Sequence, residues 1–441
     1  MGPELLLLLA VVLGIYALLG KPLFAVLGGA AVLTHLWGTW DSFEQARVPL
    51  QLDAIFIEAA TIVDGPYYIA IPLFVFAGTL LAESGAPERL VRLARALFGW
   101  LPGGLAIVAT VTCAFFTAFT GASGVTIVAL GGLLYPVLRR ERYPDGFSIG
   151  LLTTGGSLGL LFPPSLPLIV YGLIAGVDVD KLFVAGILPG LLLVAVLSGY
   201  GMLVGKLRGV ERTRLSLGAI GPALRAAAFE LPIPVLILVG IYGGYVTATE
   251  ASAVVALYCL VVEVFVLRDI GARAFVVVVR KTAELVGAIL IILIMALGLK
   301  NYLVYAEVPQ QLLALMKSHI HSPLTFLLVL NVFLIAVGCL LDIFSAILVV
   351  VPLVAPLAHA FGVDPIHLGI IFLTNLEIGY LTPPVGINLF LGGLRFERPI
   401  LEVARHVLPF LGLLVLCLVV ITYVPSLSLL LVHWSMGAGG P

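Results

Sequence analysis

The stretch GLLFPPSLPLIVYG, residues 159–172, places two adjacent prolines inside an apolar run that has the character of a membrane span. Proline removes a backbone N–H and clashes with the preceding helical turn, and it drives the residue before it away from helical geometry. Residues 379–392, GYLTPPVGINLFLG, repeat the pattern. Because unwound backbone leaves polar groups unsatisfied in lipid, membrane proteins tolerate such breaks only where they line a protein cavity. Each break is therefore expected to form part of a binding site.

The composition is that of a helical protein that crosses the membrane many times. Of the 441 residues, 61% are hydrophobic and 11% are charged, whereas soluble domains carry about a quarter charged residues. The net charge of −1 gives no indication of a nucleic-acid partner. The N-terminal stretch MGPELLLLLA carries an acid and predicts a retained first span rather than a cleaved signal peptide. The cysteines lie in apolar segments and are interpreted as packing residues: Cys113, Cys259, Cys339 and Cys417.

The apolar segments predict an all-α polytopic fold. The predicted single spans are about 4–20, 22–38, 66–83, 147–177, 182–205, 231–247, 251–267, 283–299, 366–394 and 406–430. Two longer runs do not fit as single crossings, and we name them hairpin 1 (104–138) and hairpin 2 (323–358). Each run is long enough for two arms that are somewhat short for the hydrocarbon core.

Positive charge predicts which side of the membrane each loop faces, because basic loops stay in the cytoplasm. Arginine and lysine gather in 89–95, 139–142, 206–225, 268–281 and 395–405, whereas 39–65, 178–181 and 359–365 are poor in them. One arrangement satisfies all these loops, and it requires both hairpins to return to the side from which they came. We predict re-entrant hairpins; a pair of full spans at each run gives the same loop sides and stays open.

A constant offset of 220 residues relates the two proline breaks. It pairs Gly159 with Gly379, Pro163 and Pro164 with Pro383 and Pro384, Gly172 with Gly392, Pro136 with Pro356, and Pro189 with Pro409. The loop 139–145 is basic, whereas its partner 359–365 has no lysine or arginine. Opposite basicity at equivalent positions predicts two inverted-topology repeats.

The repeat predicts the domain organisation. Residues 1–83 would form scaffold spans of the first repeat, and 84–205 its arm helix, hairpin 1, broken helix 147–177 and following span. Residues 206–230 would be a cytoplasmic linker. Residues 231–300 would form the scaffold of the second repeat, and 301–441 its arm helix, hairpin 2, broken helix 366–394 and last span.

The hairpin midpoints and the breaks carry groups that suit an ion. FTGASGVT at 119–126 is small and hydroxylated, and CLLDIFSA at 339–346 places Asp342 and Ser345 at the equivalent depth. Carbonyl and hydroxyl oxygens suit a hard cation such as Na⁺, and the N-terminus of a half-helix suits an anion. A carboxylate within the membrane is a functional hypothesis by default. Asp342 is therefore interpreted as an ion ligand, with a structural hydrogen bond as its alternative.

Other polar residues carry weaker predictions. Glu377 is a candidate that could equally pair within the scaffold, and Asn375 and Asn388 could be packing amides or ligands. The arginines 89, 92 and 95 predict an amphipathic interfacial helix anchored by Trp100. Glu250 is read as part of a solvated turn, and His319 and His321 have no matching metal ligands. The sequence has no phosphate-binding GxxxxGK[ST] loop, so ATP is not the evident energy source, and no organic cofactor is expected.

Four motifs resemble one transporter family across nearly the whole chain. IPLFVFAG (71–78), FFTAFTGASG (115–124), GGSLGLLFPPS (155–165) and IGYLTPPVGINLF (378–390) look like the large membrane subunit of tripartite ATP-independent periplasmic (TRAP) transporters. The resemblance implies a sodium-driven secondary importer of organic acids with a scaffold and an elevator-type moving domain. It also implies a small four-helix membrane partner, a periplasmic substrate-binding protein, and a bacterial or archaeal cytoplasmic membrane.

The resemblance also implies two Na⁺ sites. The first would be formed by Thr120, Ala122, Gly159, Phe162 and Pro164, and the second by Asp342, Gly379, Thr382, Pro384 and Val385. Phe162 stands where the family often has a smaller aliphatic residue, and Ala122 where some members have a polar side chain, so these ligands would be backbone carbonyls. We place the substrate carboxylate between the two hairpin tips, near Ser123, Ser165 and Asn388.

Three rival functions remain. A sodium-coupled symporter or antiporter of the same superfamily would need no binding protein. An intramembrane enzyme would use Asp342 as an acid, but the position equivalent to Asp342 is Ala122, which supplies no second catalytic group. A channel is disfavoured because the breaks do not form a ring motif.

Overall fold

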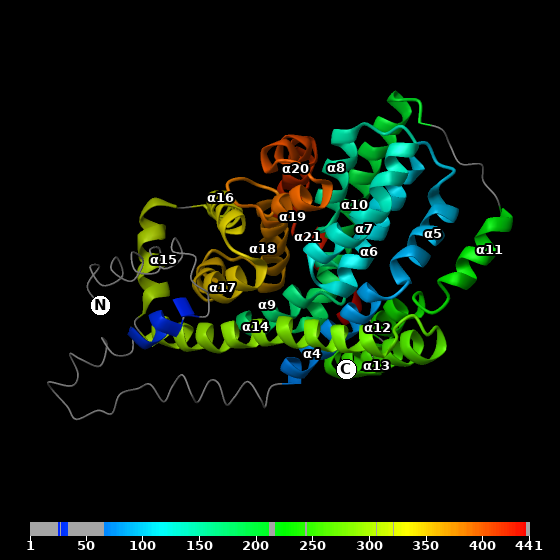
Figure 1. The fold of residues 1–441 in the computed structure, drawn as a ribbon. Helices are drawn as coiled ribbons and strands as arrows, with labels where there is room; N and C mark the ends of the chain where they lie inside the picture. The colour runs from blue at the N-terminus through cyan, green and yellow to red at the C-terminus, as the bar shows by residue number, and fades with distance from the viewer. Residues whose placement is uncertain are drawn as a thin grey trace, which may run out of the picture.

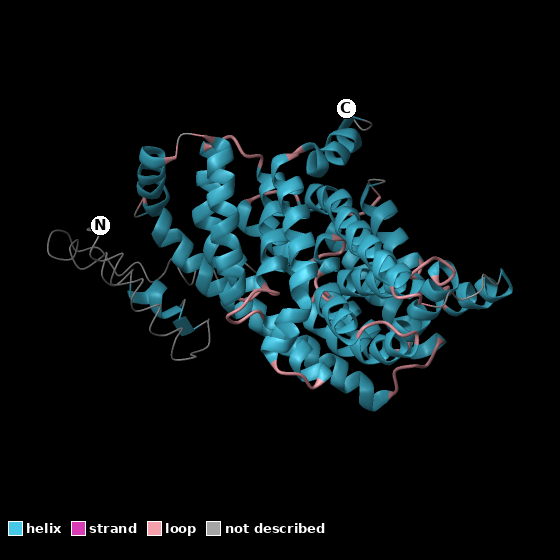
Figure 2. Cartoon of the chain, turned by 90° about the horizontal axis from the view of Figure 1, so that it is seen from above, coloured by secondary structure: helices cyan, strands magenta, loops and turns pink. Residues whose placement is uncertain are grey.

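The computed structural model describes residues 25–26, 28–33, 66–210, 217–242, 245–305, 307–320 and 322–437. The predicted span 4–20, the loop 39–65 and most of span 22–38 lie outside these residues. Within them the chain is a set of helices joined by short loops, without strands (Figure 2). Six of these helices are long and apolar enough to cross a membrane, or up to eight if two bent pairs each count as one span. The prediction of an all-α polytopic membrane protein is confirmed.

The first half of the described chain runs from α4 to α10. Its elements are α4 (Pro66–Glu83), α5 (Ala86–Phe98), α6 (Gly104–Thr120), α7 (Ser123–Arg140), α8 (Asp145–Gly155), the 3₁₀ helix η1 (Leu158–Leu161), α9 (Leu166–Ala175) and α10 (Val179–Leu207). Hairpin 1 is α6 followed by α7. The stretch between α8 and α9, residues 156–165, is break 1.

The second half runs from α11 to α21. Its elements are α11 (Leu217–Ala226), α12 (Pro232–Tyr242), α13 (Ala248–Leu260), the π-helix η2 (Val261–Val266), α14 (Ala272–Tyr305), α15 (Val308–His319), α16 (Pro323–Leu340), α17 (Ile343–Ala360), α18 (Pro365–Gly379), α19 (Ile387–Phe396), α20 (Ile400–Tyr423) and α21 (Ser426–Gly437). Hairpin 2 is α16 followed by α17. The stretch between α18 and α19, residues 380–386, is break 2.

The bounds of several helices recur at the 220-residue offset. Both ends of α7 and α17 are 220 residues apart, as are the first residues of α8 and α18. The first residues of α9 and α19, and of α10 and α20, keep the offset to within one residue. The peptide bonds Pro163–Pro164 and Pro383–Pro384 are both cis. The helix bounds thus recur at the offset found in the sequence, and the two inverted-topology repeats stay a prediction.

The helices fall into two groups by their contacts. In one group α4 packs against α13 and α14, and α12 packs against α13. The other group holds the two hairpins, the broken helices, α10 and α20. The groups meet where α4 contacts α6 and α9, and where α14 contacts α17. Figure 1 shows the long α14 crossing the lower part of the molecule, with α6, α7, α8 and α10 standing above it.

Several predicted spans have different ends in the structure. The span predicted at 283–299 is the middle of the 34-residue α14. The span predicted at 406–430 begins earlier and ends at Tyr423, because Pro425 cannot continue the helical hydrogen bonds and a separate α21 follows. The arms α16 and α17 have 18 residues each and are among the helices long enough to span. Their length suits a re-entrant arm or a short crossing, so the re-entrant topology stays a prediction.

Candidate functional site

Break 1 unwinds the helix where the proline pair predicted it. Helix α8 ends at Gly155, the 3₁₀ helix η1 follows, and α9 begins after Ser165. The Ser165 hydroxyl accepts a hydrogen bond from Leu168 N at 3.3 Å and donates one to Leu160 O, so it caps α9 and ties it to η1. The Gly159 carbonyl accepts from Phe162 N at 3.0 Å. Phe162 O accepts no hydrogen bond from a described residue, so it is an unpaired carbonyl at the break.

Break 2 repeats this geometry. The Gly379 carbonyl accepts from Thr382 N at 2.9 Å, as Gly159 O does from Phe162 N. Within the described chain, no donor reaches Thr382 O, and the Thr382 hydroxyl donates to Ile378 O at 2.8 Å. The two breaks differ in burial, because Pro163 and Pro164 are buried whereas Pro383, Pro384 and Val385 are exposed.

The tip of hairpin 1 is the tight turn that its glycines predict. Gly121 ends α6 with φ +63°, a left-handed conformation that glycine adopts without strain, and its N–H bonds Thr117 O at 2.8 Å. A Cβ atom on Gly121 would lie 2.5 Å from the Leu166 side chain, so the tip touches the first residue of α9. Ala122 O accepts only a long bond from the Thr120 hydroxyl, at 3.5 Å. The tip therefore presents oxygen atoms beside break 1.

The tip of hairpin 2 is organised by Asp342, which is the N-cap of α17. One carboxylate oxygen accepts from Phe344 N and Ser345 N at 3.0 Å each, and the other accepts from the Ser345 hydroxyl. These bonds satisfy free N–H groups at the helix start. The structural role weighed as the alternative for Asp342 is thus present. It is compatible with ion binding, because Oδ2 accepts only the Ser345 hydroxyl among the described residues and keeps a second lone pair.

Hairpin 2 is joined to break 2 by backbone contacts. Gly386 N donates to Cys339 O at 3.2 Å, and Ile343 N donates to the Tyr380 hydroxyl. A Cβ atom on Gly379 would lie 2.5 Å from backbone atoms of Gly338, so only glycine permits this approach. No hydrogen bond between described residues joins Pro384 or Val385 to Asp342. The structure thus brings Asp342 and Gly379 to neighbouring elements and leaves Pro384 and Val385 on the exposed side.

The two halves of the chain contact each other at the hairpin tips. The Ser123 hydroxyl, at the start of α7, donates to Asn388 Oδ1 in α19 at 2.8 Å. Both residues are buried, and Asn388 Nδ2 has no hydrogen-bond partner in the described part of the chain. Helix α7 packs on α19 and α17 packs on α9, so each hairpin contacts the half-helix of the other half. The structure brings together Ser123 and Asn388, whereas the Ser165 hydroxyl is engaged within break 1.

Glu377, the candidate ion ligand that could equally pair within the scaffold, is deeply buried. It is 1% exposed, and its Oε1 has no hydrogen-bond partner among the described residues. Asn375 was predicted to be either a packing amide or a ligand. It packs as an amide, because its Nδ2 donates to Asn331 Oδ1 and to Ile371 O, both at 2.8 Å.

Asn331 belongs to a buried polar network that the sequence analysis missed. Asn331 Nδ2 donates to the Thr422 hydroxyl at 3.1 Å, and the His367 ring contacts Ser428 Oγ and Thr422 O at 3.1 and 3.2 Å. The network joins α16, α18, α20 and α21. The sequence signal that could have predicted this network is an amide side chain in the middle of an apolar helix. Polar side chains in membrane helices form hydrogen bonds with one another.

Two charged residues outside the breaks have partners that the sequence analysis did not name. Arg89 lies on the predicted helix α5 and pairs with Glu230, Glu263 and Asp269. Glu250 was expected in a solvated turn and instead lies in the first turn of α13. Its carboxylate accepts from Thr247 N at 2.8 Å in a capping box, because free N–H groups at a helix start attract such acceptors.

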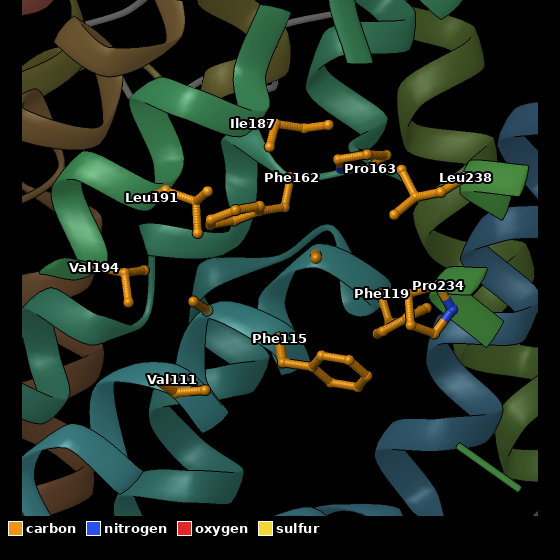
Figure 3. Close-up of a pocket in the computed structure, with 12 residues that line it drawn as sticks. Val111, Phe115, Phe119, Phe162, Pro163, Ile187, Leu191, Val194, Pro234 and Leu238 are labelled. Carbon is orange, nitrogen blue, oxygen red and sulfur yellow. The ribbon is translucent and has the colours of Figure 1, made fainter. Parts of the chain in front are cut away.

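An apolar cavity of about 350 Å³ lies beside break 1. Figure 3 shows side chains of hairpin 1 (Phe115, Phe119), break 1 (Phe162) and α10 (Leu191) facing Leu238 of α12 across this space. Its lining has almost no polar surface, so the cavity is unsuited to a carboxylate. It separates hairpin 1 from α12 of the other helix group.

The chemistry available at the breaks is that of oxygen ligands. No three His, Cys, Asp or Glu side chains gather as a metal-binding set in the part of the chain that the structure describes. The oxygens at the tips and breaks are backbone carbonyls, hydroxyls and one carboxylate. Oxygen donors of this kind suit a hard cation rather than a soft metal that takes thiolate or thioether ligands.

Comparisons with known proteins give one consistent result. The family model described as tripartite ATP-independent periplasmic transporter, DctM component, matches residues 6–427. The C4-dicarboxylate TRAP transporter large permease protein DctM of Pseudomonas aeruginosa is 36% identical over 367 residues, which cover 83% of this chain and 86% of that protein. The isethionate TRAP transporter permease protein DctMQ of Oleidesulfovibrio alaskensis is 35% identical over 427 residues. This match covers 96% of the chain and 66% of that relative, so the chain spans just under two thirds of its length.

A solved structure supports the fold. The YdaH transporter of Alcanivorax borkumensis matches with a TM-score of 0.56 and 16% identity, covering 86% of this chain and 88% of that one. At this identity the likeness concerns the fold alone.

Proposed function

Because the chain belongs to the DctM component family of tripartite ATP-independent periplasmic transporters, a family of multi-pass membrane permeases rather than enzymes, we propose that it is the permease of a Na⁺-coupled importer of organic acid anions. The observation that carries this proposal is the pairing of each hairpin tip with a break in which one carbonyl, that of Phe162 or of Thr382, accepts no hydrogen bond from a described residue. A second component would deliver the substrate, as the family name implies.

The Na⁺ sites are proposed at the two tips. Site 1 uses oxygens of Thr120, Ala122, Gly159, Phe162 and Pro164, and site 2 uses Asp342, Gly379, Thr382, Pro384 and Val385. Support comes from the unpaired carbonyls of Phe162 and Thr382, which occupy equivalent positions in the two breaks. An unpaired carbonyl is costly in a membrane interior unless a cation or donor meets it.

The substrate carboxylate is proposed to bind between the tips. Ser123 and Asn388 already meet there, and the unpartnered Asn388 Nδ2 offers a buried N–H donor. Such a donor suits an anionic oxygen. Ser165 contributes through the N-terminus of α9, whose first turn it caps. The two relatives described above are named as transporters of isethionate and of C4-dicarboxylates, so the proposal extends only to the class of small organic acids.

The mechanism is proposed to be an elevator with two inverted repeats. The scaffold would be 1–83 and 231–300, and the moving part would be the hairpins, broken helices and following spans within 84–205 and 301–441, joined by the linker 206–230. The arm helix α5 would stay with the scaffold, because Arg89 pairs with Glu230, Glu263 and Asp269. The recurring helix bounds and the opposite charge of equivalent loops support the repeat. The apolar cavity between α12 and hairpin 1 supports a moving interface, because it holds no polar contact that motion would break.

The partners and location follow from the family. We propose that the chain works in a bacterial cytoplasmic membrane with a small four-helix membrane subunit and a periplasmic substrate-binding protein. The alternative is a symporter or antiporter that needs no binding protein.

The test is transport in proteoliposomes that contain the permease, its small subunit and a substrate-loaded binding protein. We expect uptake of labelled organic acid only with an inward Na⁺ gradient, and none when K⁺ replaces Na⁺ at the same membrane potential. Uptake that persists without Na⁺ would refute the coupling. Na⁺-driven uptake without the binding protein would favour the alternative.

A further inference from the structure

A second pocket, of about 400 Å³, opens between α8, α10 and α20. Helix α20 packs against both α8 and α10, the Phe147 ring of α8 meets the Tyr200 ring of α10, and the three helices lie together in Figure 1. Its floor is aromatic: the Phe147, Tyr200 and Phe410 rings have centroids 5.2 to 5.7 Å apart. Its rim carries Arg208 at the end of α10 and Arg405 and His406 in α20. An apolar floor under a basic rim fits an amphiphile with an anionic head.

Of the three rim side chains, His406 has a carboxylate partner, Glu402, whose Oε1 lies 3.7 Å from His406 Nε2, whereas the charges of the two arginines are uncompensated. Arg208 and Arg405 form no ion pair with a carboxylate of the described chain. The nearby carboxylates are already occupied: Asp145 pairs with Arg139 at 3.2 Å and with Arg398 at 3.1 Å, and Glu402 lies 3.6 Å from Arg398. Attraction to Glu402 and Asp145 raises the pKa of Arg398. Two positive charges therefore remain free to meet an anion.

The pocket opens toward lipid. Leu203 and Leu207 line it and are 53% and 75% exposed, and Leu408 beside it is 58% exposed. Exposed leucines on spanning helices contact acyl chains. Arg208 and Arg405 also belong to the basic segments that the charge distribution assigns to the cytoplasmic side. Basic pockets between spanning helices on that side bind the head groups of anionic lipids.

We propose that this pocket binds an anionic phospholipid of the inner leaflet, with the phosphate between Arg208 and Arg405 and an acyl chain along Leu203 and Leu207. Helix α10 belongs to the first half of the chain and α20 to the second, so the lipid bridges the two halves. The site does not depend on Na⁺ coupling or on the identity of the transported acid.

The test measures binding of phosphatidylglycerol to the delipidated full chain in detergent by native mass spectrometry and thermal shift. The double variant Arg208→Ala with Arg405→Ala is expected to bind about thirtyfold more weakly, because about 1 kcal/mol per arginine amounts to about 2 kcal/mol, at about 1.4 kcal/mol per tenfold. The matched control, Arg92→Ala with Arg140→Ala, removes two exposed and unpaired basic charges elsewhere and should bind like the unmodified chain.

Two comparison ligands identify the source of the phosphate. Phosphatidylcholine with the same acyl chains should give no arginine-dependent shift, and glycerol phosphate should give a much smaller one than the lipid. Equal binding of phosphatidylglycerol to both double variants would overturn the proposal, as would glycerol phosphate binding as well as lipid.

Discussion

At the scale of single residues, Asp342 combines two tasks that can be separated by experiment. Its carboxylate caps α17 through Phe344 N and Ser345 N, and we propose that the same group binds Na⁺. Asparagine also caps helices well but carries no charge. Alanine neither caps a helix nor carries a charge.

We predict that Asp342→Asn leaves thermal stability within a few tenths of a kcal/mol but abolishes Na⁺-dependent uptake. Asp342→Ala should lose uptake and also about 1 kcal/mol of stability, because the cap is removed. Thermal unfolding in detergent and Na⁺ titration of uptake in proteoliposomes measure the two effects. Unchanged Na⁺ dependence in Asp342→Asn would remove this residue from site 2.

Gly379 lies where the neighbouring backbone leaves no room for a side chain. Its Cβ atom would meet Gly338 backbone at 2.5 Å, and backbone cannot move aside as a flexible side chain can. We predict that Gly379→Ala costs about 1–3 kcal/mol of unfolding free energy through overpacking. Gly412→Ala is the matched control, because nothing lies within 4 Å of a Cβ atom there. It should be neutral or stabilising by up to about 1 kcal/mol, since alanine favours helix. Equal melting temperatures for the two variants would contradict the close packing of hairpin 2 on break 2.

At the scale of elements, one arginine of α5 forms ion pairs with three carboxylates from the second half of the chain. Arg89 pairs with Glu230 before α12, Glu263 in η2 and Asp269 before α14. The Glu230 and Glu263 side chains are at most 2% exposed, so the arginine offsets charge that water cannot reach. Helix α5 links α4 to hairpin 1, and this contact fixes its outer face to the second half of the chain.

We predict that Arg89→Ala destabilises the protein by about 3–5 kcal/mol, because it leaves buried carboxylates without a partner. Arg92→Ala, on the exposed face of the same helix, should change stability by no more than about 0.5 kcal/mol. Adding Glu263→Gln to Arg89→Ala should recover part of the loss. A similar small effect for both single variants would show that the cluster is solvated.

Patterns within a few residues made some features predictable from the sequence, whereas contacts between distant residues were not predictable. The proline pairs, the glycine turn at Gly121 and the apolar runs act within a few residues, so the breaks and hairpins could be placed from sequence. The partners of Arg89 and the Asn331–Thr422 contact join residues far apart in the chain, and no local pattern encodes them. The carbonyls of the breaks were predictable by position, whereas the Ser123–Asn388 bond needed the packing of α7 on α19.

At the scale of the whole molecule, the inverted topology makes a prediction about sidedness. Arg140 and Ala360 are 220 residues apart, both exposed, and end α7 and α17. In a chain with inverted repeats, equivalent positions face opposite sides of the membrane.

We predict that a membrane-impermeant maleimide labels Ala360→Cys in intact cells and labels Arg140→Cys only after the cells are opened. The background should be low, because Cys113, Cys259, Cys339 and Cys417 are all buried. Labelling of both positions from the same side would show that the repeats run parallel.

The contact between Ser123 and Asn388 joins residues 265 positions apart, and this spacing has a consequence for synthesis. At roughly 5–20 residues per second, the ribosome delivers Asn388 roughly 13 to 53 seconds after Ser123. Until then α7 lacks α19 as a packing partner, and its buried hydroxyls must be shielded by lipid, water or a chaperone. A nascent chain stalled between α10 and α18 would therefore be the form most open to quality-control proteases.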